Sequence, residues 1–304
     1  MVRLALLLLL SAAGLSPALA AVDMDAAAQI YEAAGVREQV RASLGAMPGR
    51  IRDMFQAEAK TALTPPQTKA ITDAAERGFR IDVFEPSAIA ALAGNLDAPT
   101  ARKILAFLQS DLGARMVKAD KALAALDEPT IDKVMAGQLK APSDPKREQL
   151  IEKLEIAARS TESTVQIFTS MGRAVAIGTA IGTGQDPIAV EEKSRKAGDA
   201  SRREMEGNMR EPLRRYMAYG YRELSDADLK NLLSFLESKV GVRYVSAYTA
   251  AMGAGFDAMG KRCGEQLGGT LREMAVAQAQ NGPAQNAPTA PSAPTAAPPA
   301  PASK

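Results

Sequence analysis

Residues 224–245 read LSDADLKNLLSFLESKVGVRYV, and residues 96–117, which lie 128 positions earlier, read LDAPTARKILAFLQSDLGARMV. Eight of these 22 positions are identical without a gap. In the later stretch Ser225 can cap a helix whose leucines recur at helical spacing, which places them on one apolar face. Ser238 then breaks that helix and can cap the next one, and Gly241 lets the two helices approach closely. Both stretches therefore predict the same helical hairpin.

The hairpin is the centre of a longer match between two parts of the chain. Residues 30–50 parallel residues 154–173 in the spacing of their apolar side chains, at a slightly smaller offset. Strand patterns are nearly missing, whereas helical spacing recurs throughout. We therefore expect an all-α protein of two tandem divergent helical repeats, 21–140 and 146–279, packed as helical bundles with pseudo-twofold symmetry. A rigid linker with two prolines, residues 141–145, separates them.

Caps and prolines predict where the helices begin and end. Thr64 followed by Pro65 is a start signal, and Pro48 is expected to kink or break the first helical segment, over 30–54. The other segments are three helices within 88–139 with breaks near Ser110 and at Glu128-Pro129, a helix from Lys146 past Met171, a loop at 182–187, and helices over 190–223, 226–237 and 239–279.

The hexad at 224–229 and the corner at 235–241 resemble a motif of secreted bacterial proteins catalogued as domain of unknown function 2059. That family usually has tyrosine after the phenylalanine and proline after the serine, where this chain has Leu236 and Lys239. The first copy departs further, because residues 96–99 lack the acidic pair of the hexad. The resemblance implies an all-α fold and export to the cell envelope, and it implies no reaction.

The start of the chain has the pattern of a secretory leader. Arg3 supplies a positive charge, residues 4–10 are an unbroken apolar run, and Ala18-Leu19-Ala20 is a small-x-small cleavage box. We expect a signal peptide over 1–20, cleavage after Ala20, and a periplasmic or secreted mature protein. The apolar run is too short to cross a bilayer, and no later stretch is long enough, so we expect no transmembrane segment in the mature chain.

The other end of the chain has a different composition. Residues 280–304 consist largely of alanine, proline, threonine and serine, with seven prolines. Such a segment cannot bury enough apolar surface to offset the entropy lost on ordering. We therefore expect a disordered Pro/Ala-rich C-terminal tail.

The composition excludes several classes of chemistry. The chain has no histidine and a single cysteine, Cys263. Histidine-dependent catalytic triads and histidine-ligated metals are therefore impossible, and no intrachain disulfide can form. A net charge of +2 and an aromatic content of 4% supply neither the field nor the stacking surfaces that nucleic acids need. We expect no catalytic residue, no metal, no cofactor and no nucleic-acid partner.

The last predicted helix carries two notable features. Cys263 lies on its apolar stripe, which favours a buried thiol over a reactive one. Gly260, Gly264 and Gly268 recur every four residues, so another helix can pack closely against them. That helix can belong to the same chain, which we favour, or to the partner in a homodimer.

A second group of candidate binding residues lies on the helix expected over 190–223. Arg203, Arg210 and Arg214 share one side of it and could dock an anionic envelope partner. Glu206 precedes Arg210 at ion-pair spacing, which favours instead a solvated, salt-bridged face.

Two functions remain compatible with these features. The first is an exported, non-enzymatic helical protein of the cell envelope that binds a protein or peptide partner through a groove between helices, with the three arginines and three glycines as partner-binding residues. The alternative is a binder of a lipid or another small apolar ligand, held in a cavity between the two repeats. An enzyme would need a Ser/Lys or carboxylate site, and the sequence contains no recognisable motif for one.

Overall fold

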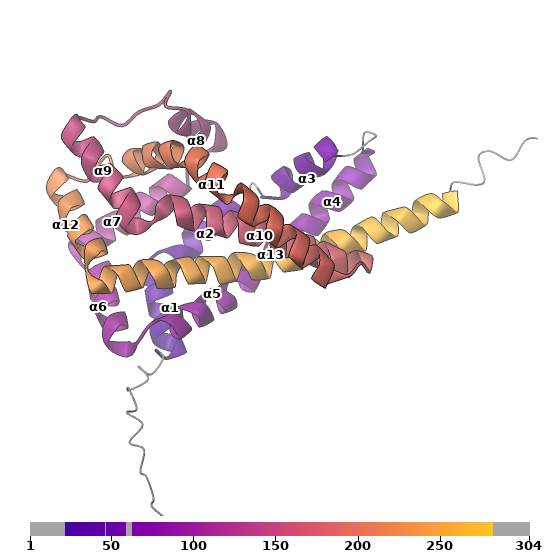
Figure 1. Cartoon of the computed structure of the whole chain (residues 1–304), viewed down its shortest axis with the longest axis horizontal. Coiled ribbons are helices and arrows are strands. Elements are labelled where there is room, and N and C mark those ends of the chain that lie inside the picture. The colour runs from indigo at the N-terminus through magenta and orange to yellow at the C-terminus, as the bar shows by residue number, and fades with distance from the viewer. Residues whose placement is uncertain (1–21, 46, 59–62, 282–304) are drawn as a thin grey trace, which may run out of the picture.

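The computed structural model of the protein describes residues 22–45, 47–58 and 63–281 (Figure 1). The expected signal peptide and nearly all of the expected tail lie outside the described residues, within which the chain is all-α and has no β-strand. The helices are α1 (Met24–Ala33), α2 (Val36–Leu44), α3 (Met47–Glu58), α4 (Pro65–Gly78), α5 (Ile81–Asn95), α6 (Ala98–Leu108), α7 (Asp111–Ala124), α8 (Glu128–Met135), α9 (Pro145–Ala158), α10 (Ser160–Thr183), α11 (Pro187–Gly220), α12 (Asp226–Glu237) and α13 (Lys239–Asn281).

Local sequence signals set several of these boundaries as predicted. Thr64 caps α4, and both its backbone N–H and its hydroxyl donate to the Gln67 side chain, at 2.9 and 3.0 Å. Ser225 caps α12 in a capping box with Asp228. The linker 141–145 carries no helix before Pro145, the first residue of α9. These helix ends could be predicted from the sequence because each capping residue hydrogen-bonds with residues within one turn of it.

Two helical segments are interrupted at places that the sequence did not predict. Within 30–54, Gly35 separates α1 from α2, because it takes the left-handed conformation (φ 65°) that glycine adopts without strain. The break predicted at Pro48 is confirmed, since α2 ends at Leu44 and α3 begins at Met47. The helix expected from Lys146 past Met171 stops at Arg159, which also has a positive φ of 51°. There the buried Glu155 carboxylate accepts hydrogen bonds from the backbone N–H and hydroxyl of Thr161, at 3.2 and 2.6 Å, and so satisfies the start of α10.

The region 88–139 also differs from the prediction of three helices. It holds the end of α5 in addition to α6, α7 and α8. The extra break comes from Asp97, whose carboxylate caps α6 by accepting from the N–H of Thr100 at 2.9 Å. The predicted break at Ser110 is confirmed.

The two hairpins turn through corners of the same geometry. The Ser110 hydroxyl donates to the carbonyl oxygen of Phe107 at 2.6 Å and accepts from the N–H of Gly113 at 3.1 Å. The Ser238 hydroxyl makes the same two bonds with residues at the same spacing, at 2.6 and 3.0 Å. Each corner thus places a Leu-rich helix tightly against the start of the helix that follows it.

We call residues 22–140 the first half and residues 146–281 the second half. They share one hydrophobic core, which is centred on α13. This long helix crosses the molecule beside α10 and also packs on α4 and α5 of the first half (Figure 1). The ring of Phe84 meets that of Phe256 edge-on, with centroids 5.2 Å apart. The fully buried side chains come from both halves and include Ile30, Ile71, Ile104, Leu154, Leu229, Met259 and Leu267.

Candidate functional site

Gly260, Gly264 and Gly268 of α13 lie against α10 of the same chain. A Cβ on Gly264 would lie 2.1 Å from the carbonyl oxygen of Val175, and one on Gly268 would lie 2.6 Å from that of Thr179. The prediction that these glycines receive a helix of the same chain is confirmed. Their assignment as partner-binding residues is wrong, because the backbone of α10 already fills the space beside them.

The three arginines of α11 do not form a common free surface. Arg210 pairs with Glu162 of α10 at 2.8 Å, and Arg214 pairs with Glu152 of α9 at 3.4 Å. Arg203 is exposed to solvent. Two of the three guanidinium groups are therefore already balanced by carboxylates of neighbouring helices. The pairing predicted between Glu206 and Arg210 is wrong, because Glu206 pairs with Arg202 at 3.0 Å instead.

The thiol of Cys263 is buried among apolar side chains. It is fully inaccessible, and burial raises its pKa to about 12. The backbone of α4 comes so close that a Cβ on Gly78 would lie 2.2 Å from the Cα of Cys263. A thiol in this place stays protonated and packs as a small apolar group.

An open groove lies between α1 and α7, with the end of α6 at its base. Leu108 and Val117 are buried and form its floor, and Ala28, Ala33 and Ala114 line its walls. Small walls allow the backbone of a bound segment to approach closely. Sequence reasoning did not find this groove, because α1 and α7, which form its walls, lie far apart in the chain.

Charged side chains border this groove. Glu32 pairs with Arg37 at 2.8 Å, and Lys121 pairs with Glu38 at 3.4 Å. Lys118 also lines the groove, is exposed, and forms no ion pair within the described residues. The border of the groove therefore offers one ammonium group to a bound segment.

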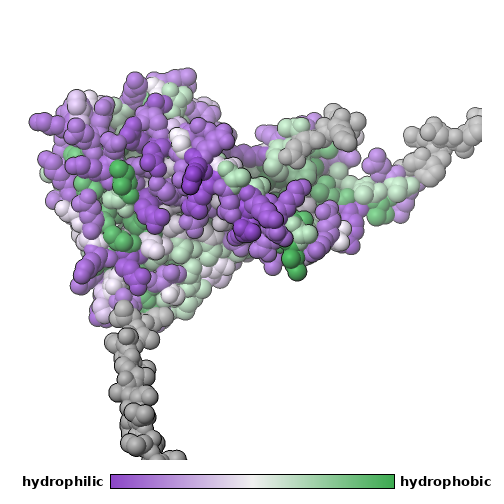
Figure 2. Space-filling model, in the orientation of Figure 1, coloured by the Kyte–Doolittle hydropathy of each residue, from purple (hydrophilic) through white to green (hydrophobic). Residues whose placement is uncertain are grey.

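The second half also exposes apolar side chains. Val242, which lies 128 positions after the groove residue Ala114, is 56% exposed. Ile156, near the end of α9, is 61% exposed. Figure 2 shows a green strip of apolar surface at the left of the molecule.

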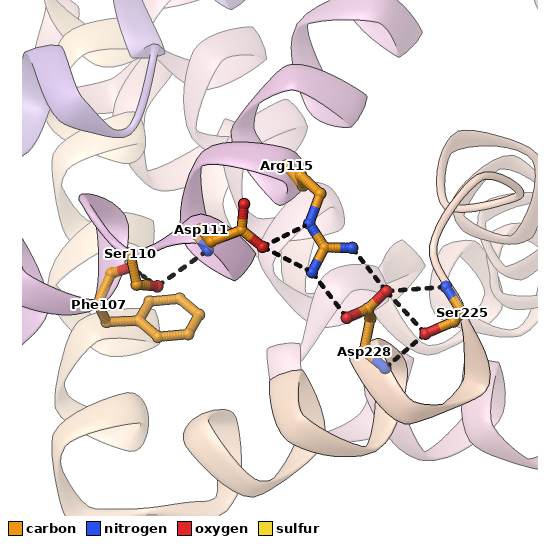
Figure 3. A network of polar contacts seen from close by, with 7 residues as sticks. Phe107, Ser110, Asp111, Arg115, Ser225 and Asp228 are labelled. Carbon is orange, nitrogen blue, oxygen red and sulfur yellow. Dashed lines mark hydrogen bonds and ion pairs between the residues drawn. The ribbon is translucent and has the colours of Figure 1, made fainter.

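A polar network ties the two halves together near the hairpin corners. Arg115 of α7 reaches across to the start of α12, where both oxygens of Asp228 accept its guanidinium hydrogens at 2.7 and 2.8 Å (Figure 3). The same carboxylate accepts from the N–H and hydroxyl of Ser225. These bonds hold the pKa of Asp228 well below its usual range.

An uncompensated carboxyl lies at the same junction. Asp120 of α7 lies near Tyr221, and its charge adds to the effect of burial in raising the pKa of Tyr216, Tyr244 and Tyr248. Burial raises the pKa of Asp120 to about 7, and the Tyr221 hydroxyl offsets only part of this effect. No motif in the sequence marks Asp120, because its tyrosine neighbours come from α11 and α13 of the other half.

Comparison of the chain with protein-family models, with curated proteins and with solved structures found no match. Across residues 22–45, 47–58 and 63–281, no helix has the length and apolar character needed to cross a membrane. Within the same residues, no three side chains of the His, Cys, Asp and Glu types lie together as metal ligands would.

Proposed function

We propose that this protein is an exported, non-enzymatic protein of the cell envelope that binds a peptide segment of a partner protein in the groove between α1 and α7. The observation that carries the proposal is the lining of that groove, an apolar floor between walls of alanine. Grooves of this form between helices accept the apolar face of an amphipathic helix. The leader pattern over 1–20 supports export.

The lining also specifies the chemistry of the bound segment. Walls formed by Ala28, Ala33 and Ala114 leave room for a helix with small or medium apolar residues on one face. Lys118 stands at the border without an acidic partner among the described residues, so a carboxylate on the bound segment would complement it. The partner segment is therefore an amphipathic helix whose apolar face is flanked by an acidic residue.

A small apolar ligand between the two halves has less support. The junction is filled by side chains, among them the stacked rings of Phe107 and Phe235 and the buried Leu229. The groove between α1 and α7 is open to solvent, whereas a small apolar ligand is usually enclosed on most sides by its binding site. A peptide, which covers a shallow groove with its own backbone, fits this shape better.

Site-specific photocrosslinking tests the proposal. A photoreactive residue at Gln109, which is exposed in the groove, should capture a partner in intact cells, whereas one at Asn208 of α11 should not. The captured segment is then synthesised, and its affinity for the purified protein is measured by calorimetry.

A matched pair of variants decides the outcome. Ala114→Arg should weaken binding of that peptide by about tenfold or more, because the long side chain fills the groove, whereas Ala200→Arg on exposed α11 should not. Equal affinity of both variants, or a captured segment without an apolar face, would reject the groove as the binding site.

A further inference from the structure

A second hollow lies where the junction of α4 and α5 meets α13. Three arginines line it, Arg77, Arg80 and Arg262, together with Asp82 and Val83. All three arginines are exposed. Three guanidinium groups therefore meet around one hollow, and their arrangement follows from how the helices cross.

The backbones of α4 and α13 force two of these arginines together. Arg77 directly precedes Gly78, and Arg262 directly precedes Cys263, and this glycine and cysteine are in contact where the helices cross. The Nε of Arg77 donates to Gln266 Oε1 at 2.9 Å, one turn beyond Arg262 on α13. The side chain of Arg77 therefore lies along α13, on the same side of the crossing as Arg262.

The positive charges that line this hollow outnumber the negative ones. Arg80 forms an ion pair with Asp82 at 2.6 Å. In the part of the chain that the structure describes, no carboxylate pairs with Arg77 or Arg262, and the partner of Arg77 is a neutral amide. The one carboxylate of the hollow, Asp82, is thus paired with Arg80, and a bound anion would relieve the mutual repulsion of the two other guanidinium groups.

The start of α5 already holds a carboxylate. Arg80 occupies the N-cap position without a side-chain cap, and its carbonyl oxygen accepts from the N–H groups of Val83 and Phe84, at 3.1 and 3.3 Å. The Asp82 carboxylate is drawn to the amides of Asp82 and Val83 as well as to Arg80, and these contacts lower its pKa. The end of the helix therefore already holds one carboxylate beside the two unpaired arginines.

We propose that this hollow is a binding site for a phosphate-type oxyanion, which Arg77 and Arg262 hold between them. The planar fork of each guanidinium donates two parallel hydrogen bonds to such a group. The same chemistry is offered by the headgroup of an anionic phospholipid and by a free phosphate or pyrophosphate. Asp82 occupies the side next to Arg80, so the anion enters from the α13 side.

Two measurements on the purified protein distinguish these sources. Calorimetric titration with inorganic phosphate and pyrophosphate tests the free anions, and co-sedimentation with phosphatidylglycerol vesicles, against phosphatidylcholine vesicles, tests the headgroup. The site variant is Arg77→Gln/Arg262→Gln. The matched control is Arg102→Gln/Lys103→Gln, which removes the same charge from exposed positions of α6.

The site variant should weaken binding about tenfold or more, because it removes both guanidinium contacts, while the control should leave it nearly unchanged. Binding of either free anion supports a soluble ligand, and binding of phosphatidylglycerol vesicles alone supports a headgroup. Absence of binding in all arms, or equal weakening in both variants, would overturn the proposal. If the double variant does not fold by circular dichroism, the single variant Arg262→Gln at an exposed position takes its place.

Discussion

The ring of Phe107 lies flat on the ring of Phe235, with centroids 3.6 Å apart and planes 4° from parallel. These residues are 128 positions apart and occupy the same place in the two similar hairpins. The predicted pseudo-twofold packing of two repeats would bring such equivalent positions together. The contact joins α6 to α12 and gives the junction of the halves a stacked aromatic pair.

Removing either ring should destabilise the fold. Phe107→Ala and Phe235→Ala should each lower the free energy of unfolding by about 1–3 kcal/mol, because both rings are only partly buried. A double-mutant cycle measured by urea unfolding should give a coupling of about 0.5–1.5 kcal/mol. Phe168→Ala, which removes a 42% exposed ring of α10, serves as the control and should cost less. Strictly additive effects of the two substitutions would show that the stack contributes nothing of its own.

The ion pair between Arg115 and Asp228 should contribute stability that depends on pH. Because the folded protein lowers the pKa of Asp228, this contribution is complete above the pKa of the unfolded carboxyl and is lost as the pH falls through the folded pKa. Arg115→Gln should therefore lower the unfolding temperature by a few degrees at neutral pH and by less in strong acid. Calorimetry at both pH values, with the exposed Arg102→Gln as control, checks this expectation.

The two hairpin corners should not tolerate a side chain at their glycines. A Cβ on Gly113 would lie 2.0 Å from the carbonyl oxygen of Phe107, and one on Gly241 would lie as close to that of Phe235. Each glycine-to-alanine change should therefore cost about 1–3 kcal/mol. Gly207→Ala in exposed α11 meets no atom within 4 Å and should instead stabilise the protein by about 0.5–1 kcal/mol. Thermal unfolding compares the three variants, and equal effects would contradict the close approach at the corners.

Asp120 should make the protein more stable in mild acid than in base. Its folded pKa of about 7 exceeds the unfolded value near 4, so between these values the folded state binds a proton that the unfolded state lacks. The free energy of unfolding should thus fall by about 1–4 kcal/mol as the pH rises from 4 to 8. Asp120→Asn should remove most of this slope, whereas Asp132→Asn at an exposed position of α8 should preserve it. If Asp120→Asn leaves the pH dependence of the free energy of unfolding unchanged, other groups cause it.

The Cys263 thiol should be unreactive in the folded state. Its burial and raised pKa leave almost no thiolate at neutral pH, and α4 blocks the approach of a reagent. A disulfide reagent should label it only at the rate of unfolding, so labelling should accelerate in urea. Rapid labelling of the native protein would contradict the burial.

How much of the fold could be read from the sequence depended on the range of each interaction. The corners at Ser110 and Ser238 were predicted because the serine, its acceptor and its glycine lie within one turn. The break at Arg159 was missed, because it depends on the buried carboxylate of Glu155, six residues before its partner Thr161. Helical periodicity alone cannot detect such a cap.

The candidate site was less accessible to sequence reasoning. Glycine spacing correctly indicated close packing on α13, but it did not show that α10 supplies the matching glycines, Gly178 and Gly182. The groove between α1 and α7 and the hollow beside Arg262 combine residues from distant helices. Alanines and arginines of this kind are common on exposed helix surfaces, so only their positions in space distinguish them.

The shared core can close only after the helices of both halves have been synthesised. A ribosome finishes α4 and α5 long before it makes α13, the helix that covers them. Until α13 emerges, Phe84 lacks the ring of Phe256 as its partner, and the nascent chain exposes apolar surface that can aggregate. For the export that we propose, a fold whose core closes only when α13 has been made would remain open while the earlier helices are synthesised.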